Sequence, residues 1–138
     1  MKARTAISSD AQYVEALLAQ LGHPRGIDHA KFTCTYQSAL NDENHLILVL
    51  EDNDIIIGYV SVRIHSPLYA QDRVAFVDEI VIDETRRGHG AGRQLMQYLE
   101  AILQERGCVL CSLATVGSKG FYQNLGYSGH ATYLKRSL

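Results

Sequence analysis

The chain has 138 residues, of which 46% are hydrophobic and 20% are charged, and its net charge is −2. This composition fits one globular domain over residues 1–138 and argues against a nucleic-acid-binding protein, which usually carries a basic face. No apolar run approaches the roughly 20 residues of a membrane span, and the N-terminus has no apolar signal core, so we expect a cytoplasmic protein.

The first forty residues predict a strand and two helices. Residues 2–7 form the candidate strand, and Ser9-x-x-Gln12 has the form of a capping box at the start of a helix. Gly22 is the expected stop of that helix, and a loop over 23–27 leads to a second helix capped by Asp28. The apolar residues expected on the buried faces of the two helices are Val14, Leu17, Leu18, Leu21, Phe32, Tyr36, Ala39 and Leu40.

The middle of the chain predicts a meander of three strands, over 45–50, 55–64 and 73–82. Turn-forming residues over 51–54 join the first two strands as an antiparallel hairpin. Gly58 stands inside the second strand, where it favours a bulge. Pro67 marks the loop before the third strand.

The last third of the chain predicts a loop over 83–90 and a long amphipathic helix over 92–106 that Gly107 ends. A strand over 109–113, a short helix over 121–125 and a last strand over 127–134 follow. Strand, helix and strand in this order favour a parallel pair joined by a right-handed crossover. We therefore predict an α/β fold with a mixed, mostly antiparallel sheet and flanking helices.

The cysteines and histidines do not indicate a disulfide framework or a metal site. Cys34, Cys108 and Cys111 are an odd number at wide spacing, and the Cys108-Val-Leu-Cys111 motif lies in an apolar run, so we expect core cysteines. The six histidines show no metal-ligand spacing, and we predict no metal. They are His23, His29, His45, His65, His89 and His130.

The stretch RRGHGAGRQLM, residues 86–96, predicts an anion site. The N-terminus of a helix presents unpaired N–H groups and the positive end of its dipole. Without Cβ atoms, Gly88, Gly90 and Gly92 let a phosphate approach these groups, and Arg86, Arg87 and Arg93 could add charge. The stretch lacks the lysine of a Walker A loop and the spacing of a dinucleotide fingerprint. The alternative is a flexible turn with a helix cap.

At these residues the chain resembles the GNAT superfamily of N-acetyltransferases. Residues 87–92, RGHGAG, match that family's [RQ]-x-x-G-x-[GA] signature, and FYQNLGY, residues 121–127, resembles its F-Y-x-x-x-G-[FY] segment. The order of predicted elements agrees with the family over nearly the whole chain. The resemblance implies the GNAT fold, with a splayed pair of parallel strands, and an acetyl-CoA cosubstrate.

The resemblance also assigns binding residues for acetyl-CoA. The pyrophosphate would lie on the signature loop, and the pantetheine arm would lie between the strands over 73–82 and 109–113, pairing with the backbone of the first. Carried over to this sequence, the cofactor-binding residues are Ile80, Val81, Ile82, Arg87, Gly88, His89, Gly90, Ala91, Gly92 and Arg93.

Two residues are candidates for the chemistry of direct acetyl transfer to an amine. Glu79 stands where several members of the family carry a glutamate and is the candidate base; strand alternation places the adjacent Asp78 on the opposite face, so only one of them would point at the site. Tyr122, in the F-Y segment, is the candidate acid for the leaving thiolate. The segment before Tyr122 is about four residues shorter than in many relatives, has no counterpart of their asparagine that contacts CoA, and has Ser118 near the position of their alanine.

The acceptor is expected to be the primary amine of a small molecule. The resemblance places its pocket at residues 26–32, 65–72 and 127–133, with candidates His29, His65, Tyr69 and Tyr133. A protein N-terminus or lysine as acceptor, and a non-catalytic acyl-CoA-binding module, are the alternatives. Relatives occur as monomers and homodimers, and the sequence favours neither.

Overall fold

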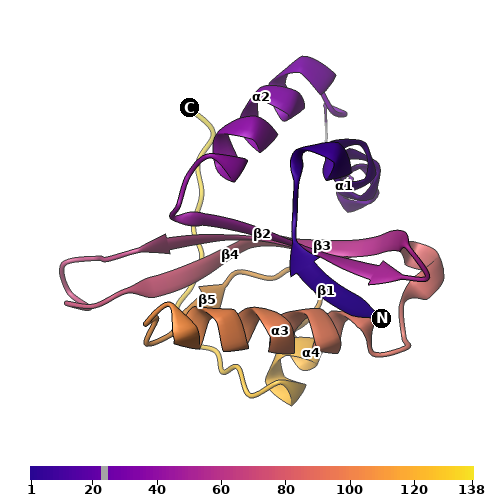
Figure 1. The fold of residues 1–138 in the computed structure, drawn as a ribbon. Helices are drawn as coiled ribbons and strands as arrows, with labels where there is room; N and C mark the ends of the chain where they lie inside the picture. Colours follow the sequence, from indigo (N-terminus) through magenta and orange to yellow (C-terminus); the bar gives the residue numbers. More distant parts are fainter. Residues whose placement is uncertain (23–24) are drawn as a thin grey trace.

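A computed structural model describes residues 1–22 and 25–138, so His23 and Pro24 of the first interhelical loop lie outside the described residues. Five strands form one mixed sheet in the order β1-β2-β3-β4-β5, with α1 and α2 on one face and α3 and α4 on the other (Figure 1). All neighbours are antiparallel except β4 and β5, which are parallel, as predicted. The strands are β1 (Lys2–Thr5), β2 (His45–Asp52), β3 (Ile55–His65), β4 (Val74–Ile82) and β5 (Cys111–Leu113), and the α-helices are α1 (Ala11–Leu18), α2 (His29–Leu40), α3 (Ala91–Glu105) and α4 (Lys119–Asn124).

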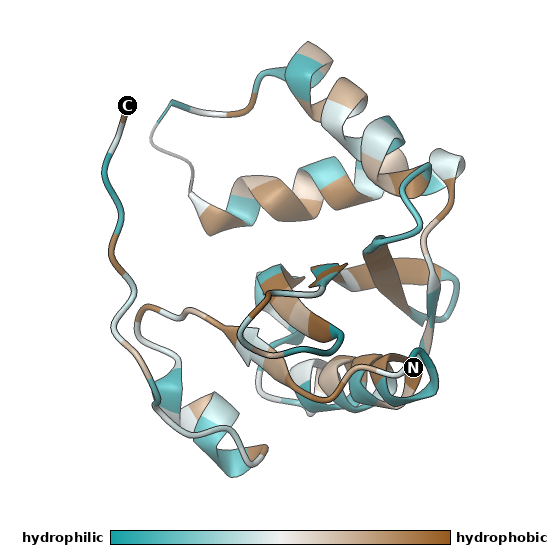
Figure 2. Cartoon of the chain, turned by 90° about the vertical axis from the view of Figure 1, so that its left-hand side faces the viewer, coloured by the Kyte–Doolittle hydropathy of each residue, from teal (hydrophilic) through white to brown (hydrophobic). Residues whose placement is uncertain are grey.

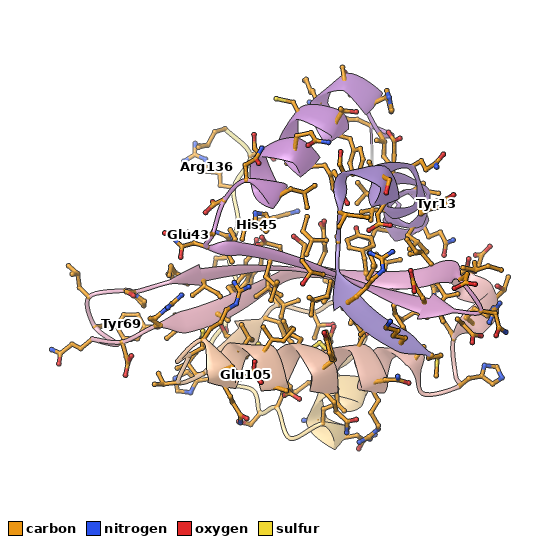
Figure 3. All side chains as sticks on the ribbon, in the orientation of Figure 1. Tyr13, Glu43, His45, Tyr69, Glu105 and Arg136 are labelled. Carbon is orange, nitrogen blue, oxygen red and sulfur yellow. The ribbon has the colours of Figure 1, made fainter. Side chains whose placement is uncertain are left out.

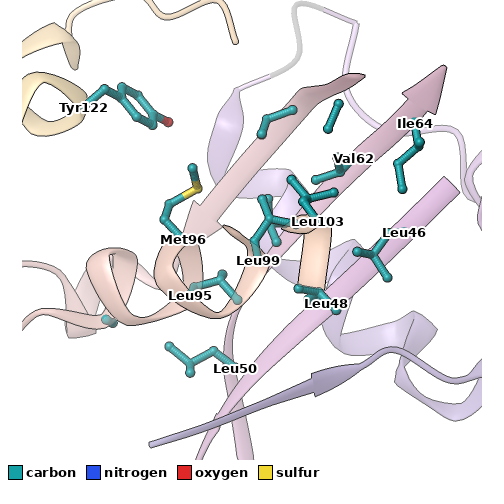
Figure 4. Close-up of a cluster of buried hydrophobic side chains, with 14 of the residues drawn as sticks. Leu46, Leu48, Leu50, Val62, Ile64, Leu95, Met96, Leu99, Leu103 and Tyr122 are labelled. Atoms are coloured by element: carbon teal, nitrogen blue, oxygen red, sulfur yellow. The ribbon is translucent and has the colours of Figure 1, made fainter. Parts of the chain in front are cut away.

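Helix α3 packs its predicted apolar stripe against one face of the sheet. Leu95, Met96 and Leu99 are completely buried, and Leu103 nearly so. Their partners on the strands form one continuous cluster that includes Leu46, Leu48, Leu50, Val60, Val62 and Ile64 (Figure 4). The polar side of α3 faces away from the sheet (Figure 2). Because strand residues alternate between faces, a second and separate core lies under α1 and α2.

The two N-terminal helices have different caps. Asp28 caps α2 as predicted, accepting a hydrogen bond of 3.0 Å from the Lys31 N–H. The predicted Ser9–Gln12 capping box is wrong, because a 3₁₀ turn over Ser8–Asp10 precedes α1 and the Asp10 carboxylate accepts from the Ile7 N–H at 2.8 Å. Asp10 also takes two hydrogen bonds from Arg4, at 2.8 and 3.0 Å, and is only 4% exposed.

We expect Asp10→Ala to lower the free energy of unfolding by about 2–4 kcal/mol. The change removes the acceptor of the Ile7 N–H and leaves Arg4 with Glu51 as its one carboxylate partner. The Asp28→Ala control, at an exposed cap, should lose only about 1 kcal/mol. Arg4 holds the pKa of Asp10 below its usual value. The carboxylate's contribution is therefore complete above about pH 4 and is lost as the pH falls through the lower folded pKa. Urea titrations from pH 7 to pH 2 measure both effects; equal losses in the two variants would contradict the prediction.

The β2–β3 hairpin contains the bulge that Gly58 favours. Leu50 of β2 pairs with Gly58, and the next residue, Glu51, pairs with Ile56. Ile57 is therefore an extra residue in β3. A Cβ atom on Gly58 would lie 2.6 Å from Ile82 Cδ1, which explains the glycine. The close approach holds the last residue of β4 against β3.

The C-terminal part of the sheet is shorter than predicted. Val109 and Leu110 are 59% and 45% exposed and precede β5, so the predicted buried strand over 109–113 is only three residues long. The predicted last strand over 127–134 is wrong, because residues 128–138 are irregular and fully on the surface. Cys108 and Cys111 pack against the core as predicted, and burial raises the pKa of both thiols; Cys34 is exposed.

Candidate active site

The two parallel strands pair over a short distance and then part. Ala75, Phe76 and Val77 of β4 lie opposite Cys111, Ser112 and Leu113 of β5. From Glu79 to Ile82, β4 keeps its pairing with β3 and has no partner on its other side within the described sheet. Unpaired backbone groups along one side of Ile80–Ile82 can therefore hydrogen-bond a ligand that lies between the strands.

A bulge in β4 lies at this point. Ser61 of β3 pairs with Glu79 and the next residue, Val62, pairs with Val77, which leaves Asp78 as the extra residue. The predicted alternation of Asp78 and Glu79 is therefore wrong. Asp78 accepts three hydrogen bonds of 2.8–3.1 Å from Arg63, while Glu79 interacts with Tyr59, and both contacts lie on the α1/α2 face. The bulge presents both carboxylates on one face of the sheet.

The two carboxylates differ in environment. Asp78 is exposed and paired with a guanidinium. Glu79 is half-buried; burial raises its pKa, the nearby charge of Asp78 adds to the rise, and the Tyr59 hydroxyl opposes it. A carboxylate with a raised pKa is a better proton acceptor than an ordinary one, which suits Glu79 to the role of a base.

The loop before α3 supplies a group of exposed N–H donors. Gly88 and Gly90 have φ of +81° and +83°, a left-handed conformation that favours glycine. Helix α3 begins at Ala91, one residue earlier than predicted, and its first helical bond runs from the Gln94 N–H to the Gly90 carbonyl. No side chain caps this end. The N–H groups of the first turn are therefore directed toward solvent, as an anion site requires.

The third glycine and the arginines have other partners than expected. A Cβ atom on Gly92 would lie 3.0 Å from Phe121 Cζ of α4, so this glycine permits packing between two helices. Arg86 pairs with Asp52, and the Nε of Arg87 donates to the Ile82 carbonyl at 2.9 Å. Arg93 is exposed on the first turn of α3. Arg87 thus ties the loop to the end of β4.

Tyr122 is held in α4 by aromatic contacts. Its ring lies edge-on to Phe121 at 5.0 Å and to Tyr127 at 6.0 Å, measured between ring centroids. It is 8% exposed, and its hydroxyl points away from α4 toward the core (Figure 4). Burial raises the pKa of this phenol, so Tyr122 stays protonated at neutral pH and can act as a hydrogen donor. The shorter segment before it still places Tyr122 on the inner side of α4.

A cleft of about 740 Å³ opens where β4 and β5 part. Two of the four predicted acceptor residues, His65 and Tyr133, line it. His29 instead pairs with Glu15 at 2.8 Å, and Tyr69 is 85% exposed at the β3–β4 turn, so neither belongs to the cleft. The other residues around the cleft are Arg63, Phe76, Val77, Asp78, Ala114, Thr115 and Val116.

The prediction from sequence missed the β3 residues that face Glu79, namely Tyr59, Ser61 and Arg63. The signal was present, since a tyrosine, a serine and an arginine alternate in IIIGYVSVRI and so share one face of that strand. Within the described part of the chain, no three His, Cys, Asp or Glu side chains are grouped so that they could hold a metal ion.

Comparison with known proteins identifies one family. The model of the acetyltransferase (GNAT) family matches residues 12–127. A probable glucosamine 6-phosphate N-acetyltransferase from Drosophila melanogaster is 26% identical over 115 residues, which are 80% of this chain and 52% of that protein. The chain thus spans about half the length of this relative.

Solved structures share the fold over the full chain. The crystal structure of a transcriptional regulator from Bacillus halodurans C-125 superposes with a TM-score of 0.91 at 24% identity, covering 99% of both chains. That of glucosamine-6-phosphate N-acetyltransferase from Arabidopsis thaliana gives 0.85 at 23%, covering 99% of this chain and 97% of that one. At these identities the likeness shows the fold alone. No helix in residues 1–22 and 25–138 combines the length and apolar character needed to span a membrane.

Proposed function

Because the chain belongs to the acetyltransferase (GNAT) family, whose members use acetyl-CoA, we propose that residues 1–138 form one domain that transfers an acetyl group from acetyl-CoA to the primary amine of a small molecule. The observation that carries this proposal is the parting of β4 from β5 beside Glu79, at the open end of α3. The parted strands and the helix end offer backbone donors for the two ends of one extended ligand.

The loop and the open strand would hold the cosubstrate. N–H groups of residues 88–93 bind the diphosphate, with Arg87 and Arg93 supplying positive charge. The free side of Ile80–Ile82 hydrogen-bonds the amides of the pantetheine arm, and the thioester comes to lie near the bulge. Apart from the charges of Arg87 and Arg93, these contacts come from the backbone and are therefore independent of side-chain conformation.

Glu79 and Tyr122 would carry out the proton transfers. An alkylamine is mostly protonated at neutral pH and must lose a proton before it attacks the thioester carbonyl, so Glu79 accepts that proton. Tyr122 donates a hydrogen bond or a proton to the sulfur as the carbon–sulfur bond breaks. The two groups come from opposite faces of the sheet, Glu79 from the α1/α2 side and Tyr122 from α4, and in this proposal the thioester lies between them.

The cleft favours a small acceptor with both polar and aromatic character. Its volume of about 740 Å³ lies within the usual range for small-molecule sites. Arg63, His65, Phe76 and Tyr133 offer hydrogen bonds and ring faces, and Asp78 offers a carboxylate for an ammonium group. Glucosamine 6-phosphate, the substrate in the names of two proteins compared above, is the first candidate acceptor.

A screen for thiol release tests the proposal. The purified protein is incubated with acetyl-CoA and a panel of amines that includes glucosamine 6-phosphate, other amino sugars, amino acids and a lysine peptide. We expect CoA release above background with at least one small amine. Binding of CoA in calorimetry without turnover on any panel member would favour the non-catalytic module, and turnover on the peptide alone would favour a protein acceptor.

A further inference from the structure

Polar side chains form a row across the α1/α2 face of the sheet. His45 Nε2 of β2 lies 2.7 Å from Ser61 Oγ of β3, and Ser61 is directly opposite Glu79 of β4. Figure 3 shows His45 on the α2 side of the sheet. Next to the row, Ile47, Val49 and Val81 on the same face are buried and apolar. The row therefore runs from the candidate base to the outer part of the sheet.

Packing alone does not explain this row. Ser61 is 6% exposed, and a buried hydroxyl contributes less to a core than an apolar side chain of similar size. Next to the row, Tyr59 Oη is buried and has no hydrogen-bond partner of regular geometry among the described side chains, although it lies close enough to Glu79 to influence the pKa of that carboxylate. An unpaired buried hydroxyl of this kind is usually satisfied by a water or a ligand. Tyr59 thus adds a buried polar group next to Glu79.

We propose that Ser61 and His45 carry to solvent the proton that Glu79 takes from the amine, an inference that rests on the proposed function. Protonated Glu79 transfers its proton toward Ser61 Oγ while Ser61 gives its own proton to His45 Nε2, and the half-exposed imidazolium then releases a proton to water. Directly opposite residues have Cβ atoms about 5 Å apart, a gap that the glutamate side chain and one bridging water can cover. Glu79 is returned as a carboxylate, and no electrons are exchanged.

Other ionisable groups lie around the row and could carry charge or take up the proton. Arg63 lies opposite His45 on the same face, but it is paired with Asp78, so their charges largely cancel. Tyr59 on β3 and Tyr36 on α2 are buried phenols that stay neutral, since burial raises the pKa of Tyr36 to about 12 and that of Tyr59 further. In the turn before β2, Asp42 and Glu43 are exposed acids. The imidazole of His45 has two ring nitrogens, so one can accept a proton from Ser61 while the other releases one to water.

The test uses the full chain, acetyl-CoA and the best acceptor from the amine panel. His45→Ala and Ser61→Ala should each lower kcat on the order of tenfold at neutral pH in dilute buffer, with the KM for acetyl-CoA unchanged. Added imidazole should restore kcat of His45→Ala toward the wild-type value, because it replaces the missing proton acceptor. Ser61→Thr, which keeps the hydroxyl, should stay near wild type. Gln37→Ala, which removes an exposed 3.0 Å hydrogen bond from α2 to Ser8, is the control and should show no buffer dependence.

The outcomes separate this inference from the proposed function. Turnover by the wild type that depends on Glu79, together with wild-type kcat in both alanine variants, would overturn the relay and leave the acetyltransferase proposal intact. A loss of kcat that imidazole does not restore in His45→Ala would also overturn it, since a structural role would give that result. If His45→Ala does not fold, the comparison of Ser61→Ala with Ser61→Thr decides, because equal rates in these two variants would contradict a role for the hydroxyl.

Discussion

Replacing Glu79 by glutamine is expected to lower kcat by about 10²- to 10⁴-fold near neutral pH, the usual contribution of a general base. The amide keeps the shape of the side chain but cannot accept the proton of the amine. The loss should be greatest above the raised pKa of Glu79 and below the pKa of the amine, because only there is the wild-type base ionised while the acceptor is still protonated. Steady-state rates from pH 5.5 to 10 measure this window.

The neighbouring carboxylate is the matched control. Asp78→Asn removes a charge one residue away and frees Arg63, but it leaves the half-buried base in place. We expect a smaller loss of kcat, with the main effect on the KM of the acceptor, since Asp78 lines the cleft. Equal losses of kcat in the two variants, or a pH profile of Glu79→Gln parallel to that of the wild type, would remove Glu79 from its proposed role.

Loss of stability does not explain such a result. The folded pKa of Glu79 is raised above its unfolded value, mainly by burial. A group of this kind favours the folded state at low pH and loses that contribution as the pH rises through the folded pKa, so ionised Glu79 opposes folding at neutral pH. Glu79→Gln removes this opposition. Its melting temperature at pH 7 should therefore equal or exceed that of the wild type.

Gly90→Glu is expected to weaken binding of CoA at least 100-fold. The change places a carboxylate at the open end of α3, where the diphosphate is proposed to lie, and like charges repel strongly at short range. It also removes the glycine from a φ of +83°, which adds about 1–2 kcal/mol of backbone strain. Isothermal calorimetry with CoA measures the affinity.

Gly107 offers a control for both strain and charge. It follows the same helix at its other end, has a φ of +81°, and like Gly90 has no atom within 4 Å of the position of a Cβ. Gly107→Glu should therefore lose similar stability but keep the CoA affinity of the wild type. A similar loss of affinity in both variants would show that helix strain, and not the anion site, causes the effect.

Local patterns predicted most of the fold correctly, because each signal lay within a few residues. The apolar stripe of α3, the cap at Asp28 and the three strands of the meander were predictable from periodicity and turn residues alone. The segment over 127–134 has the same composition as a strand but finds no neighbour to pair with. A strand depends on a partner distant in sequence, and periodicity does not reveal whether that partner exists.

In the candidate site, too, local sequence patterns could not predict a feature that depends on pairing with a distant strand. The resemblance placed Glu79 on a strand beside the gap, and β4 lies there. The bulge at Asp78 could not be predicted, because it results from the pairing of β4 with β3 and leaves no glycine or proline in VDEIVI as a sign. Regular alternation then assigned Asp78 and Glu79 to opposite faces. The role of Gly92 was missed for a similar reason, since its contact with Phe121 joins two helices far apart in sequence.

This contact between Gly92 and Phe121 limits how the protein can diverge. Position 92 lies in the first turn of α3, where the diphosphate is proposed to bind. Position 121 precedes Tyr122, which is proposed to donate to the sulfur. A Cβ atom at 92 requires the phenyl ring to shift by a few tenths of an ångström, and a longer side chain requires more space still. A residue larger than alanine at 92 should therefore be accompanied during evolution by a smaller one at 121.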